Sequence, residues 1–166
     1  MDDGSMTLII ALVFLVACSA FFSASETAFS SLNQIRLKSR AEDGDASAAR
    51  VLAMAEKYDK LLSTILIGNN IVNIAAASIG TILFTRALGA ERGATVSTMV
   101  LTVVVLIFGE VTPKSLAKEM PETVATAVSP MLNLLMVLFT PLTWLFSQWK
   151  RLLGHFVHST EEDTIT

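Results

Sequence analysis

The feature that most constrains this chain is a carboxylate followed by a proline, both set at the end of a long apolar run. The run is apolar from Met99 to Phe108 except for Thr102, and it continues into Gly109, Glu110, Thr112 and Pro113. A carboxylate in the hydrocarbon region of a bilayer costs about 2.5–3.5 kcal/mol on insertion scales, and such residues usually mark an ion or substrate path. The run therefore predicts a functional polar site within a hydrophobic helix.

Pro113 predicts a break in the hydrogen bonding of that helix. Proline has no N–H, so the carbonyl four residues earlier, which belongs to Gly109, loses its donor. Glu110 and the Gly109 carbonyl then offer one charged and one neutral oxygen at the same depth, and oxygen ligands suit a small hard cation. The plainer alternative is a kinked helix end whose Glu110 reaches water at the membrane interface.

Composition places the chain among membrane proteins, because 52% of its 166 residues are hydrophobic and only 16% are charged. Three apolar stretches, at 6–22, 61–84 and 94–108, are long enough with their polar extensions to cross a bilayer core, which needs about 20 helical residues. We therefore predict an all-α integral membrane protein with three transmembrane helices on residues 6–32, 61–85 and 94–116.

A fourth apolar stretch at 131–146 is shorter and is interrupted by Thr140-Pro141. It is expected to be re-entrant or interfacial, and we predict juxtamembrane helices on residues 34–58 and 120–150. Together, residues 1–150 form one transmembrane domain. Residues 151–166 are expected to be a linker or tail toward a cytoplasmic region that this sequence lacks.

Basic residues predict the orientation of the chain. Six lysines and arginines lie between residues 33 and 60, whereas none precedes the first span. Basic residues in short loops favour the cytoplasm. We therefore expect a multi-pass protein of the cell (inner or plasma) membrane, with its N-terminus outside and its C-terminus in the cytoplasm. A crossing fourth stretch would place Lys150 and Arg151 outside, against this bias.

Two further polar clusters lie within the other spans. The first span ends in polar residues that include Ser23, Ser25 and Glu26, and the second span carries Asn69, Asn70 and Asn73. Such small hydroxyls and amides also serve as plain helix–helix contacts in membranes. At a rise of ~1.5 Å per residue, Asn70 lies roughly 14 Å from the inner end of its span and Glu110 about 9 Å from its own.

Compatible depths predict that the three clusters form one cation site. The residues alone leave two choices open, Ser25 versus Glu26 and Asn69 versus Asn70.

Catalysis and nucleic-acid binding are not predicted. A nucleophilic serine needs a base within hydrogen-bond reach, and no histidine or lysine lies inside a predicted span, so we predict no enzyme and no catalytic residue. His155 and His158 lack a third metal ligand and are taken as surface residues. No basic patch suits nucleic acid.

Three segments in order, FFSASETAFSSL, IGNNIVNI and FGEVTPKSLA, resemble the signature segments of the transmembrane domain of CorC/CNNM (cyclin M) magnesium transporters. The match covers nearly the whole chain. The resemblance implies a homodimer with a juxtamembrane helical belt that exports Mg²⁺ from an inward-open cavity, with Na⁺ as the proposed coupling ion. ATP binding in the family belongs to cytoplasmic CBS domains, which are absent from this sequence.

Carried onto the matching positions, the resemblance implies a metal site made of Ser23, Ser25, Asn70, the Gly109 carbonyl and Glu110. Two other functions fit the same sequence pattern. One is a passive divalent-cation channel, and the other is a membrane anchor or sensor dimer without transport.

Overall fold

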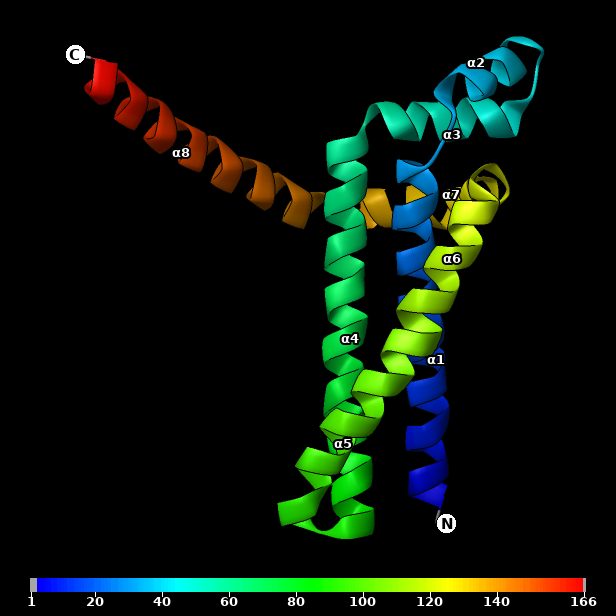
Figure 1. The fold of residues 1–166 in the computed structure, drawn as a ribbon, viewed down its shortest axis with the longest axis vertical. Helices are drawn as coiled ribbons and strands as arrows, with labels where there is room; N and C mark the ends of the chain where they lie inside the picture. The colour runs from blue at the N-terminus through cyan, green and yellow to red at the C-terminus, as the bar shows by residue number, and fades with distance from the viewer. Residues whose placement is uncertain (1–2, 166) are drawn as a thin grey trace.

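The computed structural model describes residues 3–165, and the surroundings of side chains through residue 158. Over the described range the chain is helical and contains no strand, which confirms the predicted all-α membrane fold (Figure 1). The elements are α1 (Asp3–Ser30), α2 (Gln34–Glu42), α3 (Ala46–Glu56), α4 (Tyr58–Leu88), α5 (Ala90–Val104), the π-helix η1 (Val105–Val111), α6 (Thr112–Glu119), α7 (Pro121–Leu138) and α8 (Thr140–Ile165).

Among the described residues, four helices are long and apolar enough to cross a membrane. They are α1, α4, α7 and the continuous helix that α5, η1 and α6 form on Ala90–Glu119. Figure 1 shows α1, α4 and the Ala90–Glu119 helix side by side along the length of the molecule, and these helices contact one another. In contrast, α7 crosses behind α1 and α4, close to the end where α2 and α3 lie. Its direction thus differs from that of the other three.

The outer surface of the long helices is apolar. Val13 and Phe14 on α1, Ile74 on α4 and Met99 on α5 each expose about two thirds of their surface. A band of this kind suits lipid as the solvent, because hydrocarbon imposes no cost on exposed apolar side chains. The exposed bands therefore mark the part of the bundle that a bilayer surrounds.

The packed core lies at one end of the long helices, where α2, α3 and α7 form a layer that we call the belt. Leu37 of α2, Val51 of α3 and Leu132 of α7 are fully buried there against Leu61 and Ile65 of α4. α2 and α3 lie within residues 34–58, for which the sequence predicts juxtamembrane helices. The apolar stripe of each belt helix is thus buried against the ends of the long helices.

Two polar side chains cap the first turns of the belt helices α2 and α3. Asn33 accepts a hydrogen bond from the Arg36 backbone N–H, and Asp45 accepts from the N–H groups of Ser47 and Ala48. Such caps satisfy backbone donors that have no partner within the helix. Between the two helices Gly44 has φ +98°, a backbone conformation that glycine adopts without strain.

An ion-pair network fastens the belt helices together. Arg40 of α2 lies 2.7 Å from the Asp45 carboxylate and 3.3 Å from the Glu122 carboxylate at the start of α7. Arg36 adds a longer contact of 3.8 Å to Glu122. The Arg40 hydrogen bond, followed by the bond from the Ala48 N–H, lowers the pKa of the Asp45 carboxyl below its ordinary value.

Prolines shape the segment from α7 to α8. Pro130 lies inside α7 and cannot donate to the Thr126 carbonyl, and the buried Ser129 hydroxyl bonds to that carbonyl instead at 2.9 Å. The helix then ends at Leu138, and its C-cap residue Phe139 lies directly before the Thr140-Pro141 pair. α8 continues to Ile165, so the segment 151–165, which was expected as a linker or tail, is helical.

The Asp45 cap and its ion pair can be separated by substitution. Asn caps helices as well as Asp, so Asp45→Asn removes the ion pair and keeps the cap, whereas Asp45→Ala removes both. We expect Tm in detergent at pH 7 to fall from wild type to Asp45→Asn and again to Asp45→Ala.

The same pair predicts a pH dependence. Because the folded-state pKa of Asp45 is lowered, its contribution is complete above the ordinary aspartate pKa of about 3.9 and is lost as the pH falls through the lower folded-state value. The Tm difference between wild type and Asp45→Asn should therefore disappear in strong acid. Equal Tm values at pH 7 would contradict this role of the ion pair.

Candidate cation site

Buried hydroxyls line the second half of α1. Ser19, Ser23 and Ser25 are each at most 3% exposed. Ser19 and Ser23 are four residues apart and share one face of the helix. Ser25 lies on a different face, and its hydroxyl donates a 2.6 Å hydrogen bond to the Phe21 carbonyl. The oxygen of Ser25 keeps lone pairs for a ligand, although its proton is bound within α1.

Ser19 of α1 lies against both α4 and η1. Its Oγ lies 3.5 Å from Oδ1 of Asn69 on α4, at the long limit of a hydrogen bond. A Cβ added to Gly109 of η1 would lie 3.0 Å from Oγ of Ser19. Sequence reasoning missed Ser19, which stands alone among apolar residues. Its spacing of one turn from Ser23 was the signal that could have found it.

A second close approach holds α1 against α4. A Cβ on Gly68 would lie 2.2 Å from the ring of Phe22, which is buried between the two helices. Only a residue without a side chain allows the ring to occupy this place. The contact lies one residue from Asn69 on α4 and three residues from Ser19 on α1, so it sets the distance across which that pair meets.

The structure distinguishes the three asparagines of α4. Asn69 faces Ser19, whereas the neighbouring Asn70, the residue that the resemblance implies as a ligand, is exposed. Asn73 lies one turn beyond Asn69, and its Oδ1 is buried with no hydrogen-bond partner among the described residues. Asn73 also lines a cavity of about 270 Å³ between α4 and α5, together with the hydroxyl residues Thr81, Ser97, Thr98 and Thr102.

Backbone geometry near Pro113 differs from the simple proline kink that the sequence predicts. Residues Val105–Val111 form a π-helix, and the Thr112 N–H bonds to the Ile107 carbonyl, five residues back. In an α-helix that N–H would bond to Phe108, and the N–H of residue 113 would bond to Gly109. Both carbonyls have therefore lost their α-helical donors, where the sequence predicted the loss at Gly109 alone.

Glu110 follows Gly109 and is half-buried, with 32% of its side chain exposed. Its carboxylate lies 3.7 Å from the ammonium of Lys114, one turn along the helix. Sequence reasoning missed this pairing. Lys114 is thus a built-in counter-ion for the carboxylate that we predicted to hold a metal.

The candidate site residues come from α1, α4 and η1. The closest described contacts join Ser19, Asn69 and Gly109, with Ser23 one turn away on α1 and Glu110 next in sequence to Gly109. The described residues contain no group of three or more His, Cys, Asp or Glu side chains that could hold a metal. A cation here would depend on one carboxylate and several neutral oxygens.

Three lengthwise apolar helices with a helical belt at one end are the fold of a multi-pass membrane protein. The chain belongs to the family of the cyclin M transmembrane N-terminal domain, whose model matches residues 10–166. This finding confirms the resemblance drawn from the three sequence segments.

Particular relatives are similar over most of the chain. The UPF0053 inner membrane protein YfjD of Escherichia coli is 47% identical over 135 residues, covering 81% of this chain and 31% of the relative. A UPF0053 protein of Haemophilus influenzae is 40% identical over 151 residues, covering 91% and 36%. The polyamine export protein of Salmonella typhimurium is 30% identical over 145 residues, covering 80% and 32%. The chain thus spans about a third of the length of these relatives.

The Gly68–Phe22 contact supplies a stability test. Gly68→Ala would overpack the α1–α4 contact, which typically costs about 1–3 kcal/mol. We expect a lower free energy of unfolding in detergent, and recovery of part of the loss when Phe22→Leu is added to make room. Gly154→Ala is the matched control, since a Cβ there meets no atom within 4 Å. Equal stability of Gly68→Ala and wild type would contradict the close approach.

Proposed function

We propose that this chain is the membrane-spanning part of a cation transporter that exports Mg²⁺, with Na⁺ as the coupling ion. The proposal rests on one observation above others: Glu110 lies in a π-helix beside carbonyls without their α-helical donors, where that helix packs against α1 at Ser19, whose hydroxyl also faces Asn69 of α4. Membership of the cyclin M family supports membrane transport, and relatives named as export proteins support it further.

The chemistry of the site suits a hard cation. Mg²⁺ takes six oxygens in a near-octahedral arrangement at about 2.0–2.1 Å and gives up its water reluctantly. In our proposal Glu110 supplies the negative charge that offsets this dehydration. Neutral oxygens complete the shell. They come from the implied ligands Ser23, Ser25, Asn70 and the Gly109 carbonyl, from Asn69, which the sequence left as the alternative to Asn70, and from Ser19, which lies beside Asn69.

Lys114 gives the proposed cycle a way to release its cargo. An ammonium 3.7 Å from the Glu110 carboxylate occupies the electrostatic place that a bound cation would take. Cation binding then displaces Lys114, and the return of Lys114 weakens cation binding. A site that always carries a partner for its carboxylate avoids an unpaired charge inside the membrane.

The π-helix supplies the movement that transport requires. π-helical turns in α-helices are uncommon and occur frequently at functional sites. A return of Val105–Val111 to α-helical bonding would rotate one part of the helix relative to the other and move Glu110 away from α1. Such helix movement around a fixed site is the general basis of alternating access in transporters.

A polyamine is the second candidate cargo, because four relatives at 28–31% identity carry the name polyamine export protein. The ammonium of Lys114 beside Glu110 already shows an amine held at this position. A polyamine would place one amine there and needs length for its others, whereas Mg²⁺ needs a compact shell. The two cargoes are therefore distinguishable by direct transport.

Transport should be measured in vesicles that contain the purified chain, with Mg²⁺ and spermidine tested in parallel. We expect Mg²⁺ flux, and Glu110→Gln should reduce it at least about tenfold, since even outer-shell changes at metal sites cost 10–100-fold. Glu119→Gln is the matched control, because Glu119 is an exposed carboxylate at the end of the same helix. Spermidine flux without Mg²⁺ flux would transfer the proposal to polyamines, and a flux unchanged by Glu110→Gln would overturn the site.

Substitution of Lys114 is expected to strengthen Mg²⁺ binding, the opposite of the effect expected for Glu110→Gln. Lys114→Gln removes the competing ammonium, and an ion pair at this spacing is worth roughly 0.3–0.5 kcal/mol. We therefore expect Mg²⁺ to raise the Tm of this variant at about half the concentration that wild type needs. Weaker binding in Lys114→Gln would show that the ammonium does not compete with the cation.

The choice between Asn69 and Asn70 can be made with the same measurement. Asn69 faces Ser19 and Asn70 is exposed, so each is replaced by Ala and its Mg²⁺-dependent Tm shift is recorded. We expect Asn69→Ala to lose the shift through the cluster that the structure describes. Loss in Asn70→Ala alone would favour the ligand set that the resemblance implies.

A further inference from the structure

α8 is strongly two-sided over residues 140–158. At 100° per residue its large apolar side chains fall on about half of the circumference. They are Leu142, Leu145, Phe146, Trp149, Leu152, Leu153, Phe156 and Val157, and all of them are exposed. Trp144 is the exception and lies on the opposite half with Arg151, His155 and His158, and Lys150 lies at the boundary between the two halves. Figure 1 shows α8 running outward from the bundle at the end where α7 lies. An exposed helix with these two faces, on a protein surrounded by lipid, lies in the membrane interface with its apolar half among the acyl chains.

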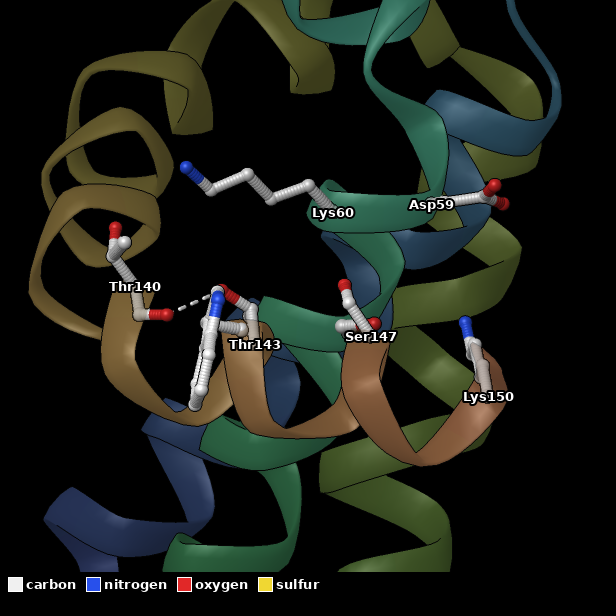
Figure 2. Close-up of a pocket in the computed structure, with 8 residues that line it drawn as sticks. Asp59, Lys60, Thr140, Thr143, Ser147 and Lys150 are labelled. Atoms are coloured by element: carbon white, nitrogen blue, oxygen red, sulfur yellow. Dashed lines mark hydrogen bonds between the residues drawn. The ribbon is translucent and has the colours of Figure 1, made fainter. Parts of the chain in front are cut away.

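A polar pocket of about 340 Å³ lies where the start of α8 meets the start of α4. Two lysines line it, Lys60 from α4 and Lys150 from α8, together with the hydroxyl residues Ser63, Thr143 and Ser147. Figure 2 shows the two lysine side chains on either side of the Ser147 hydroxyl. The pocket therefore combines cationic groups with hydroxyl donors contributed by two helices.

The charge of the pocket is positive. Asp59 also lines it, but in Figure 2 its carboxylate points away from Lys60 and from the hydroxyl groups. No ion pair joins Asp59 to either lysine among the described residues. Two ammonium groups against one carboxylate leave a net attraction for an anion, and hydroxyl groups add the hydrogen-bond donors that phosphate oxygens accept.

We propose that this pocket binds the phosphate of an anionic phospholipid head group from the leaflet in which α8 lies. The same phosphate chemistry exists in solution, but three observations favour the lipid. The apolar half of α8 gives acyl chains a continuous surface beside the pocket. Trp144, a residue type that prefers the membrane interface, lines the pocket. The apolar stretch of α4 begins at Leu61, directly after Lys60.

Such a lipid would bridge α8 to α4 independently of the transport proposal. α8 packs against the start of α4 and the end of α7. A phosphate in this pocket, which residues of both helices line, adds a link between α8 and α4, the helix that also carries Asn69. Membrane composition would thereby influence how firmly α8 is attached to the bundle.

The chain has two tryptophans, Trp144 in the pocket and Trp149 on the apolar half of α8. Trp149→Phe therefore leaves Trp144 as a sole fluorescent reporter. This variant is placed in phosphatidylcholine vesicles that contain a minority of phosphatidylglycerol with brominated acyl chains, which quench a nearby indole. The reverse vesicles carry bromine on the phosphatidylcholine instead. We expect Trp144 quenching by phosphatidylglycerol to exceed its share of the lipid several-fold.

Three further variants separate the pocket from general surface charge. Lys60→Gln and Lys150→Gln should each lower the preference by about fivefold, the factor that one lysine supplies near an anionic surface. Arg151→Gln removes a neighbouring charge of α8 that does not line this pocket, and it should keep the preference. Equal losses in Lys150→Gln and Arg151→Gln would overturn the proposal. Circular dichroism and size-exclusion elution confirm that each variant is folded.

Inorganic phosphate distinguishes the two sources of the ligand. The wild-type preference for phosphatidylglycerol should persist when phosphate replaces chloride at equal ionic strength. If phosphate abolishes the preference, the pocket binds soluble phosphate and the assignment to a lipid is wrong. Quenching in proportion to bulk composition would exclude a lipid site as well.

Discussion

The structure depends on the close approach of α1 to its two long neighbours. Gly68 lets the Phe22 ring lie against α4, and Gly109 lets Ser19 lie against η1. Between helices in a bilayer, packing and short polar contacts take the place of the hydrophobic effect, because lipid is as apolar as the side chains themselves. Two glycines thus decide how near the polar groups of three helices come to one another.

Several polar side chains of the long helices follow a common rule, which is that each has a partner within its own helix. Thr81, Thr98 and Thr102 return their hydroxyl protons to carbonyls one turn back, and Glu110 is paired with Lys114. Asn73 departs from the rule, since its buried Oδ1 has no partner among the described residues. The departure lies close to the Ser19–Asn69 contact, which is where a transported cation would need an available oxygen.

Local sequence patterns were sufficient to predict part of this structure. Hydrophobic length predicted the long helices, and the belt helices lie within the segments 34–58 and 120–150 that were predicted as juxtamembrane helices. The residues alone left Asn69 and Asn70 open, because position along a helix does not reveal what faces it. Ser19 and the Arg40–Glu122 contact were missed because they depend on helices distant in sequence. The π-helix was missed because Pro113 indicates a lost donor and not which hydrogen-bond register replaces it.

The uneven distribution of packing has a mechanical consequence. The buried core joins the belt to one end of the long helices, whereas their far ends expose large apolar side chains. α1 has 28 residues and is about 42 Å long at ~1.5 Å per residue. A tilt of about 10° around the belt would displace its far end by roughly 7 Å, since displacement grows with helix length. Because the long helices are held together mainly at the belt, a small change of tilt there produces a larger separation of the helices at their far ends.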